Sequence, residues 1–291
     1  MGRAACDLCE DMTVGEWLGY ASSRLAEAGS SEARAEASLL LVFATGLSKT
    51  QLLASPDLPA PDSMSALLDR RLGGEPVAYI TRSREFYSRE FMVSPAVLVP
   101  RHETETLVDV ALFFGPPPGS RVLDVGTGSG CLAITLALER PDLVVCASDL
   151  APEALAIARE NAACLGAEVE FREGDLLDPW RGERFHLMVS NPPYVALDEA
   201  LSREVAAFEP KCALYAGEDG LEFYRRLAHE AASHLEPTGA LVVEAGDGAA
   251  RAVEEVFVTA GWTAGGWQDD LIPFPRAGTF LPPPLGSPEP Q

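Results

Sequence analysis

From residue 119 onward the chain alternates apolar runs of strand length with segments of helical periodicity, and this alternation restricts the fold more than any other feature. The expected strands are 121–125, 143–148, 168–172, 185–190 and 239–244, and the expected helices are 130–139, 152–164, 219–235 and 248–260. Strands that alternate with helices are typical of a parallel sheet covered by helices on its faces. We therefore expect a Rossmann-like α/β domain with a mostly parallel sheet.

The N-terminal part has a different pattern, that of short amphipathic helices over residues 13–73. A Thr13-x-x-Glu16 capping box opens the first helix, Gly29 and Gly46 end the first two, and a Ser48-x-x-Gln51 box opens the third. This pattern predicts a small helical domain, and it fits a substrate-recognition role and a purely structural role equally well.

Short β-like runs follow the helical region. Residues 86–87 and 91–93 flank a polar turn at 88–90, and a further apolar run covers 97–99. We interpret this region as a β-hairpin that links two domains. The expected parts are an N-terminal helical domain (1–80), the hairpin linker (81–118), the α/β domain (119–281) and a proline-rich, disordered tail (282–291).

The balance of charges and apolar runs excludes some partners. The chain has 44 acidic and 22 basic residues, a formal net charge of −22. Such a field repels phosphate backbones, which proteins bind with clustered Lys and Arg, so we expect no nucleic acid as a direct substrate. No apolar run approaches the roughly 20 residues of a membrane-spanning helix, and the N-terminus lacks the apolar region of a secretory signal. We therefore expect a cytoplasmic, monomeric protein with no membrane partner.

Cys6 and Cys9 have the spacing of metal ligands, but no second Cys or His pair lies at a supporting distance along the chain. We expect no metal site.

A glycine-rich loop follows the first expected strand of the α/β domain. The strand ends with Asp124 and Val125 and continues into Gly126-Thr127-Gly128-Ser129-Gly130, before a helix. Glycines permit positive φ and remove the Cβ atoms that would block a ligand, while the helix N-terminus offers free N–H groups. A dinucleotide loop would have the spacing G-x-G-x-x-G, whereas this one is G-x-G-x-G after an aspartate. The spacing favours the methyl donor S-adenosylmethionine over NAD.

Carboxylates follow the next two expected strands. Asp149 ends the second strand, where it can accept hydrogen bonds from both ribose hydroxyls of the cofactor; it can also cap the helix that begins near Pro152. Asp175 follows the third strand and is predicted to meet the adenine amino group, with Leu176 packed on the ring. A simple turn is the alternative for this pair.

The fourth strand leads into Asn191-Pro192-Pro193-Tyr194, at the sheet edge where open α/β folds bind ligands. The two prolines stiffen the loop and donate no N–H. The Asn191 side-chain oxygen and the Pro192 carbonyl can accept the two hydrogens of a substrate –NH₂, and Tyr194 would stack over the planar group. We predict Asn191, Pro192 and Tyr194 as catalytic residues and the whole element as the substrate site of an amino-methyltransferase. A glutamine amide, adenine N6 or another planar nitrogen would all fit.

These motifs resemble those of the bacterial release factor glutamine methyltransferases (the PrmC/HemK type). The resemblance covers nearly the whole chain, including residues 70–80, 97–105, 124–130, 191–194 and 208–221. It implies a class I methyltransferase domain with a mostly parallel seven-stranded sheet, a small N-terminal helical domain and a β-hairpin linker.

The resemblance also implies a reaction and a partner. A methyl group would pass from S-adenosylmethionine to the side-chain amide nitrogen of the glutamine in the Gly-Gly-Gln motif of peptide chain release factors, leaving S-adenosylhomocysteine. The cofactor would be held by the glycine loop, Asp149, Leu176 and Asn191, and the glutamine by 191–194.

Other readings remain at this stage. A ribosomal-protein glutamine methyltransferase shares the Asn-Pro-Pro-Tyr element, but the Pro-Arg-x-Glu-Thr-Glu form at 100–105 is like the release factor enzymes. An adenine-N6 nucleic-acid methyltransferase is disfavoured by the acidic balance. A binding protein on a decayed methyltransferase fold would be expected to lose the glycines, Asp149 or Asn191, and all are present. The chain departs from the family pattern at His102, at 81–84, at Leu176 and over 268–280.

Overall fold

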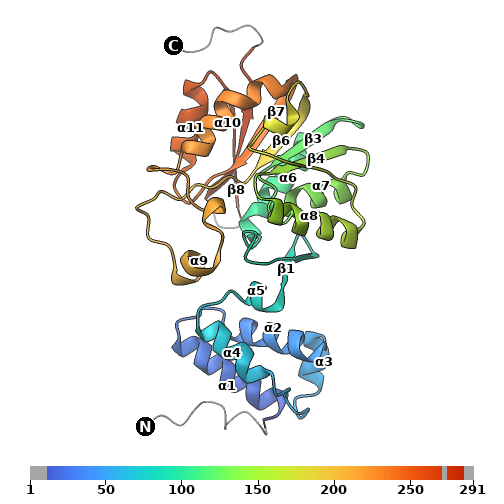
Figure 1. Ribbon diagram of the computed structural model, residues 1–291, viewed down its shortest axis with the longest axis vertical. Helices are drawn as coiled ribbons and strands as arrows, with labels where there is room; N and C mark the ends of the chain where they lie inside the picture. The colour runs from blue at the N-terminus through green and yellow to red at the C-terminus, as the bar shows by residue number, and fades with distance from the viewer. Residues whose placement is uncertain (1–11, 271–273, 285–291) are drawn as a thin grey trace. The chain divides into compact units, whose positions relative to one another are not determined.

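The structure, a computed structural model, describes residues 12–270 and 274–284 (Figure 1). The chain groups into two compact units. One comprises the residues up to Ser83 together with Ser202–Phe208, and the other comprises Arg84–Leu201 and the residues from Glu209 onward. The domain limits at residues 80 and 118 stay predictions, because this grouping describes packing and not independent folding. Cys6, Cys9 and the tail from residue 285 lie outside the described residues.

Helices make up the first unit, as the N-terminal pattern predicts. Their bounds are α1 Val14–Glu27, α2 Ala33–Thr45, α3 Lys49–Ala54, α4 Met64–Leu72, α5 Val77–Thr81 and α9 Arg203–Phe208. Both predicted capping boxes form, since the hydroxyls of Thr13 and Ser48 accept hydrogen bonds from the N–H of Glu16 and Gln51 at 3.3 and 3.2 Å. The apolar sides of α1, α2 and α4 form one buried core.

A seven-stranded sheet, counted over the described residues, organises the second unit. Its strands are β3 Arg121–Val125, β4 Val144–Asp149, β5 Glu170–Glu173, β6 Phe185–Ser190, β7 Leu235–Glu244, β8 Thr263–Asp269 and β9 Pro275–Leu281. Their order across the sheet is β5-β4-β3-β6-β7-β9-β8. The first five strands are parallel, and β9 pairs antiparallel with β7 and β8. This confirms the predicted mostly parallel, Rossmann-like sheet.

Helices cover both faces of this sheet. They are α6 Glu105–Phe114, α7 Cys131–Glu139, α8 Pro152–Leu165, α10 Glu222–Glu230 and α11 Ala250–Thr259. Because side chains alternate along a strand, Val122 packs into the core with α6, α7 and α8, whereas Leu123 packs into the core with α10 and α11. Figure 1 shows α7 and α8 on one side of the sheet and α10 and α11 on the other. Apolar side chains on both faces explain why these strands read as continuous apolar runs.

The predicted hairpin before the sheet is present, but its turn lies at a different position. Strands β1 Ser83–Phe86 and β2 Arg89–Met92 are joined by Tyr87 and Ser88, which both have positive φ, 50° and 60°. The turn is Tyr87-Ser88, so the predicted turn at 88–90 was wrong at residues 89 and 90, which belong to β2. A two-residue turn with positive φ at both positions is favoured because it matches the twist of the two strands. The hairpin is anchored by Phe86 and Phe91, which are fully buried and meet edge to face at 6.0 Å.

The predicted β-like run at 97–99 was also wrong, since these residues form no strand. Val97 instead closes a turn in which its N–H donates to the Ser94 carbonyl at 3.0 Å. Prolines 95 and 100 flank the run, and proline cannot donate to a strand ladder. The apolar pattern of this run reflects burial without a strand, since Val97 and Val99 are both buried.

Short 3₁₀ helices lie in three of the loops of this unit. They are His102–Thr104, Asp178–Trp180 and Lys211–Ala213. The helix predicted at 219–235 is shorter, because α10 ends at Glu230 and a 3₁₀ turn over Ala231–His234 leads directly into β7. In the part of the chain that the structure describes, no helix is both long and apolar enough to cross a membrane.

Candidate active site

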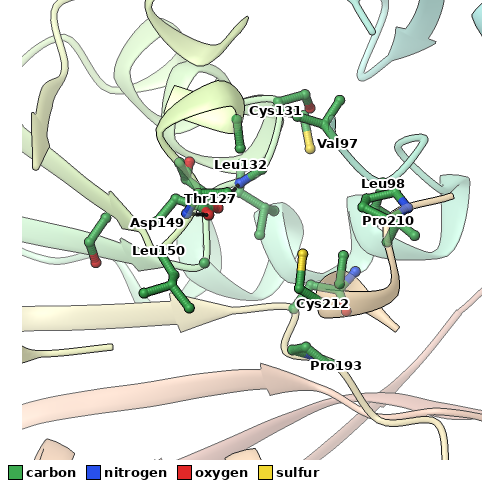
Figure 2. A pocket seen from close by; sticks show the side chains of 18 of the residues that line it. Val97, Leu98, Thr127, Cys131, Leu132, Asp149, Leu150, Pro193, Pro210 and Cys212 are labelled. Carbon is green, nitrogen blue, oxygen red and sulfur yellow. Dashed lines mark hydrogen bonds between the residues drawn. The ribbon is translucent and has the colours of Figure 1, made fainter. Parts of the chain in front are cut away.

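A cavity of about 260 Å³ opens at the carboxyl ends of β3, β4 and β6 (Figure 2). The glycine loop after β3, the end of β4 and the start of the loop after β6 all line it. Parallel strands bring their carboxyl ends to the same edge of a sheet, so segments about 20 to 65 residues apart converge there. The fold therefore brings most of the predicted site residues to one cavity.

The three glycines of the loop have two different functions. Gly126, Gly128 and Gly130 all have left-handed φ, of 75°, 54° and 82°. A Cβ built on Gly126 or Gly128 would meet no atom within 4 Å, whereas one on Gly130 would lie 2.8 Å from Ile134 Cδ1 and 3.1 Å from Ala158 Cβ. Gly130 therefore allows α7 to approach α8 closely. The first two glycines keep the cavity side of the backbone open to a ligand.

Asp124 holds the glycine loop and the start of α7 by hydrogen bonds. It is fully buried, and its Oδ2 accepts hydrogen bonds from the Thr127 hydroxyl at 2.6 Å and the Ala133 N–H at 3.2 Å. Burial raises the pKa of this carboxyl to about 7, although both hydrogen bonds lower it. Thr127 and Ser129 line the cavity, and Asp124 is not among the described residues that do so. Direct contact of Asp124 with the cofactor stays a prediction.

Asp149 lies at the end of β4 and faces the loop. Its Oδ2 accepts from the Gly128 N–H at 2.8 Å and its Oδ1 from the Ala151 N–H at 2.9 Å, just before α8. Burial raises the pKa of this carboxyl, and the backbone hydrogen bonds oppose the rise. The predicted cap of α8 was wrong, because the N-cap residue is Ala151 and no side chain caps that helix. Asp149 instead holds the backbone of the glycine loop and lines the cavity, and its contact with the ribose hydroxyls stays a prediction.

Asp175 and Leu176 line the cavity beyond β5, with two residues that the sequence did not single out. Both carboxylate oxygens of Asp175 accept from the Arg226 guanidinium, at 3.0 and 2.9 Å. Leu176 has a φ of 44°, and its carbonyl accepts from the Ser148 hydroxyl at 3.1 Å. Phe223, about one helical turn before Arg226 on α10, adds an aromatic side chain to the cavity wall. The sequence predicted only that Phe223 and Arg226 belong to a helix. Helical periodicity does not tell which strand end the helix faces, so it could not place these two residues at the cavity.

The Asn191-Pro192-Pro193-Tyr194 element follows β6, whose last residue, Ser190, donates its hydroxyl to the Val125 carbonyl at 2.7 Å. Asn191 and Pro193 line the cavity, whereas Pro192 is buried, and neither Pro192 nor Tyr194 is among the described lining residues. The Asn191 Nδ2 donates to the Thr104 hydroxyl at 3.1 Å. Its Oδ1 is buried and has no hydrogen-bond partner within the described chain.

The Tyr194 ring packs toward the end of β7. A Cβ on Gly246 would lie 2.8 Å from Tyr194 Cδ2, so glycine at 246 makes room for the ring. Burial raises the pKa of the phenol to about 12, and the nearby carboxylate of Glu244 adds to the rise. Tyr194 is therefore neutral at physiological pH. Its stacking on a substrate stays a prediction.

The linker that carries the 100–105 motif also contributes to the site. Leu98, Pro100 and Arg101 line the cavity, and the Arg101 guanidinium donates to Oε1 of the buried Glu209 at 2.6 Å. His102, where the chain departs from the family pattern, is exposed and lies 3.4 Å from Glu105 Oε1. Over residues 12–270 and 274–284, no group of three or more His, Cys, Asp or Glu side chains is arranged to hold a metal ion.

Known proteins resemble this chain over nearly its whole length. Residues 16–81 match the family described as the PrmC N-terminal domain, and residues 108–208 match the methyltransferase small domain. A release factor glutamine methyltransferase of Koribacter versatilis is 43% identical over 273 residues, which covers 91% of this chain and 97% of that protein. One of Bacillus subtilis is 41% identical over 261 residues, covering 85% and 90%.

Among solved structures, a methyltransferase from Pyrococcus furiosus aligns with a TM-score of 0.52 at 18% identity, over 75% of this chain and 99% of that chain. At that identity the likeness concerns the fold alone.

Proposed function

This chain belongs to the family of release factor glutamine methyltransferases, and from that premise we propose that it methylates the glutamine of the Gly-Gly-Gln motif in peptide chain release factors. The methyl group moves from S-adenosylmethionine to the side-chain amide nitrogen, and S-adenosylhomocysteine is the product. The observation that carries the proposal within the site is the Oδ1 atom of Asn191. It is a buried acceptor without a partner in the described structure, on a residue that lines the cavity beside the glycine loop.

The cavity fits S-adenosylmethionine, which supplies an electrophilic methyl group when bound. Gly126 and Gly128 leave open space where a Cβ would stand, as close approach of a ligand to the backbone requires. Asp149 would accept hydrogen bonds from the ribose hydroxyls. Asp175 and Leu176 would face the adenine, with Phe223 on the same wall.

The protein's own groups activate the amide by position. An amide nitrogen is a weak nucleophile because its lone pair is delocalised, so two acceptors that hold its hydrogens and favour pyramidalisation assist the transfer. The Asn191 Oδ1 and the Pro192 carbonyl would be these acceptors. Apolar side chains on the cavity wall, among them Leu98, Leu176 and Pro193, limit access of water. A general base is not required in the transfer itself, because the nitrogen that has gained the methyl group would carry a positive charge and then lose one proton to water.

The test is transfer of labelled methyl from S-adenosylmethionine to a purified release factor. We expect labelling of the intact factor and none when the glutamine of Gly-Gly-Gln is replaced by alanine. Parallel reactions would contain ribosomal proteins, DNA or RNA in place of the factor. Labelling of any of these with an unlabelled release factor would assign the chain to a different substrate class.

Asn191→Ala provides the second test. We expect it to abolish turnover and leave the affinity for S-adenosylmethionine largely unchanged, because the side chain acts on the substrate nitrogen. Turnover near that of the wild type would refute the role of Asn191. A cytoplasmic location, a monomeric state and the lack of a nucleic-acid substrate stay predictions.

A further inference from the structure

The Asp175 side chain binds a partner far along the chain and not the backbone of its own loop. An aspartate in a loop ordinarily accepts a hydrogen bond from a backbone N–H about two residues further on. In the described chain Asp175 makes no such bond, and the 3₁₀ helix that starts at Asp178 has no side-chain cap. Both Asp175 oxygens accept instead from Arg226 on α10, at 3.0 and 2.9 Å and across 51 residues of sequence.

The backbone around Asp175 sets its place in the cavity. The Gly174 N–H donates to the Asp149 carbonyl at 3.0 Å, so the loop after β5 is tied to the end of β4. Figure 2 shows Asp149 and Pro193 on separate parts of the cavity wall. Asp175 therefore lies on the Asp149 side, which the proposed function assigns to the nucleoside, and not on the Pro193 side, which it assigns to the substrate amide.

Arg226 fixes the orientation of the Asp175 carboxyl group. A guanidinium carries only donors, so both oxygens accept from it, and two parallel hydrogen bonds stop the carboxyl group from rotating about its last bond. The Arg226 Nε in turn donates to Glu230 Oε1 at 3.3 Å, one turn further along α10. The Asp175 side chain is 42% exposed, so without this pair it could rotate into water. With the pair, each oxygen keeps one lone pair at a defined position.

We propose that Arg226 is a positioning residue that holds Asp175 so that a free lone pair of its carboxyl group accepts from the 6-amino group of the adenine of S-adenosylmethionine. The inference rests on the proposed function for the cofactor and for the contact of Asp175 with adenine. Asp175 and Arg226 both line the cavity, as this contact requires. The inference adds a residue of α10 to a subsite otherwise formed by strand ends.

The pair makes the subsite selective for a purine that donates a hydrogen bond from C6. An acceptor held in place gains a bond from the amino group, and a purine without that group leaves the acceptor unpaired, at a cost in affinity. An acceptor free to rotate would return to water when the amino group is absent, and the cost would be smaller. Selectivity therefore depends on Arg226 as well as on Asp175.

The probes are S-adenosylhomocysteine and its 6-deamino analogue, which carries hydrogen in place of the amino group. Isothermal titration calorimetry gives the dissociation constant of each, and the ratio of analogue to parent measures selectivity. For the wild type we expect a ratio of at least about ten. Asp175→Ala should bring the ratio close to one, because the acceptor is gone.

Three arginine variants separate orientation from charge and from general packing. Arg226→Leu should lower the ratio to less than about three. Arg226→Lys keeps the charge but loses the two-bond geometry, so it should lower the ratio similarly. Arg225→Leu is the matched control, because it removes a similar two-bond pair with Asp219 from the next position on α10, and Arg225 is not among the described residues that line the cavity. This control should keep the wild-type ratio.

Thermal unfolding of the ligand-free proteins checks that the variants fold, and should Arg226→Leu fail to do so, Arg226→Lys carries the comparison. A wild-type ratio in either Arg226 variant would overturn the positioning role, and a wild-type ratio in Asp175→Ala would overturn the adenine contact itself. So would a ratio near one in the wild type.

The ratio needs no release factor, so it fails or holds separately from methyl transfer. The expected ratios in a protein that does not methylate a release factor would contradict the proposed function and leave the role of Arg226 in place. Methylation of a release factor by a protein whose ratio does not depend on Arg226 would do the reverse.

Discussion

Replacing Gly126 with alanine, alongside Gly119→Ala, isolates what the glycine loop contributes to ligand binding. The two glycines flank the same strand, β3, Gly119 before its start and Gly126 after its end. Their φ angles are 80° and 75°, and a Cβ at either position meets no heavy atom within 4 Å. Both substitutions therefore carry a similar left-handed backbone cost of about 1–2 kcal/mol, which corresponds to a melting temperature lower by roughly 2–8 °C for a unit of this size.

The two variants should differ only in the cavity. Gly126 lines the cavity of about 260 Å³, and Gly119 is not among the described residues that do. A methyl group on Gly126 occupies space that a ligand in contact with the backbone needs. We expect Gly126→Ala to weaken binding of S-adenosylmethionine at least about tenfold, equivalent to about 1.4 kcal/mol, and Gly119→Ala to leave it unchanged.

Isothermal titration calorimetry measures the affinities, and thermal unfolding of the ligand-free proteins checks that the backbone costs match. Wild-type affinity in Gly126→Ala would refute the close approach of the cofactor to this loop, and leave Gly126 a turn residue only. Equal loss of affinity in both variants would show that the effect comes from general destabilisation.

Two further predictions concern buried charge. Burial raises the pKa of Asp124 from the ordinary value of 3.8 to about 7. The stability that this carboxyl contributes is therefore fully present below pH 3.8 and is lost as the pH rises through about 7. Asp124→Asn, which does not titrate, should gain unfolding free energy relative to the wild type between about pH 5 and pH 8, on the order of a few kcal/mol in urea titrations; a difference independent of pH would contradict this. In the helical unit, Arg71 pairs with Glu36 at 2.8 Å and Glu204 at 2.9 Å, and its side chain is 12% exposed. Arg71→Ala should lower the unfolding free energy by about 2 kcal/mol, and the exposed Arg34→Ala by less than about 0.5; equal effects would show that the ion pairs contribute nothing.

Elements with strong local signals were predictable to within a residue or two. The limits of β3 and β6 match the predicted 121–125 and 185–190, because a strand buried on both faces is apolar at most of its positions, with Asp124 and His186 as the interior exceptions here. The start of α1 was located by its capping box, which is a contact within four residues. Strands β8 and β9 were not found, since β8 is mostly exposed and contains two glycines, so it shows no alternation of apolar and polar side chains.

The sequence by itself determined which side chains end the parallel strands, and therefore that the glycine loop, Asp149 and Asn191 meet at one edge. The physical reason is topological: once a segment is known to be a parallel strand, the position of its carboxyl end follows. Only the tertiary structure decided what surrounds them. Arg226 reaches Asp175 across 51 residues, and Thr104 reaches Asn191 across 87. Periodicity reports only the environment of a segment, buried or exposed, so the partner of a distant polar group is set by packing and cannot be read from local pattern.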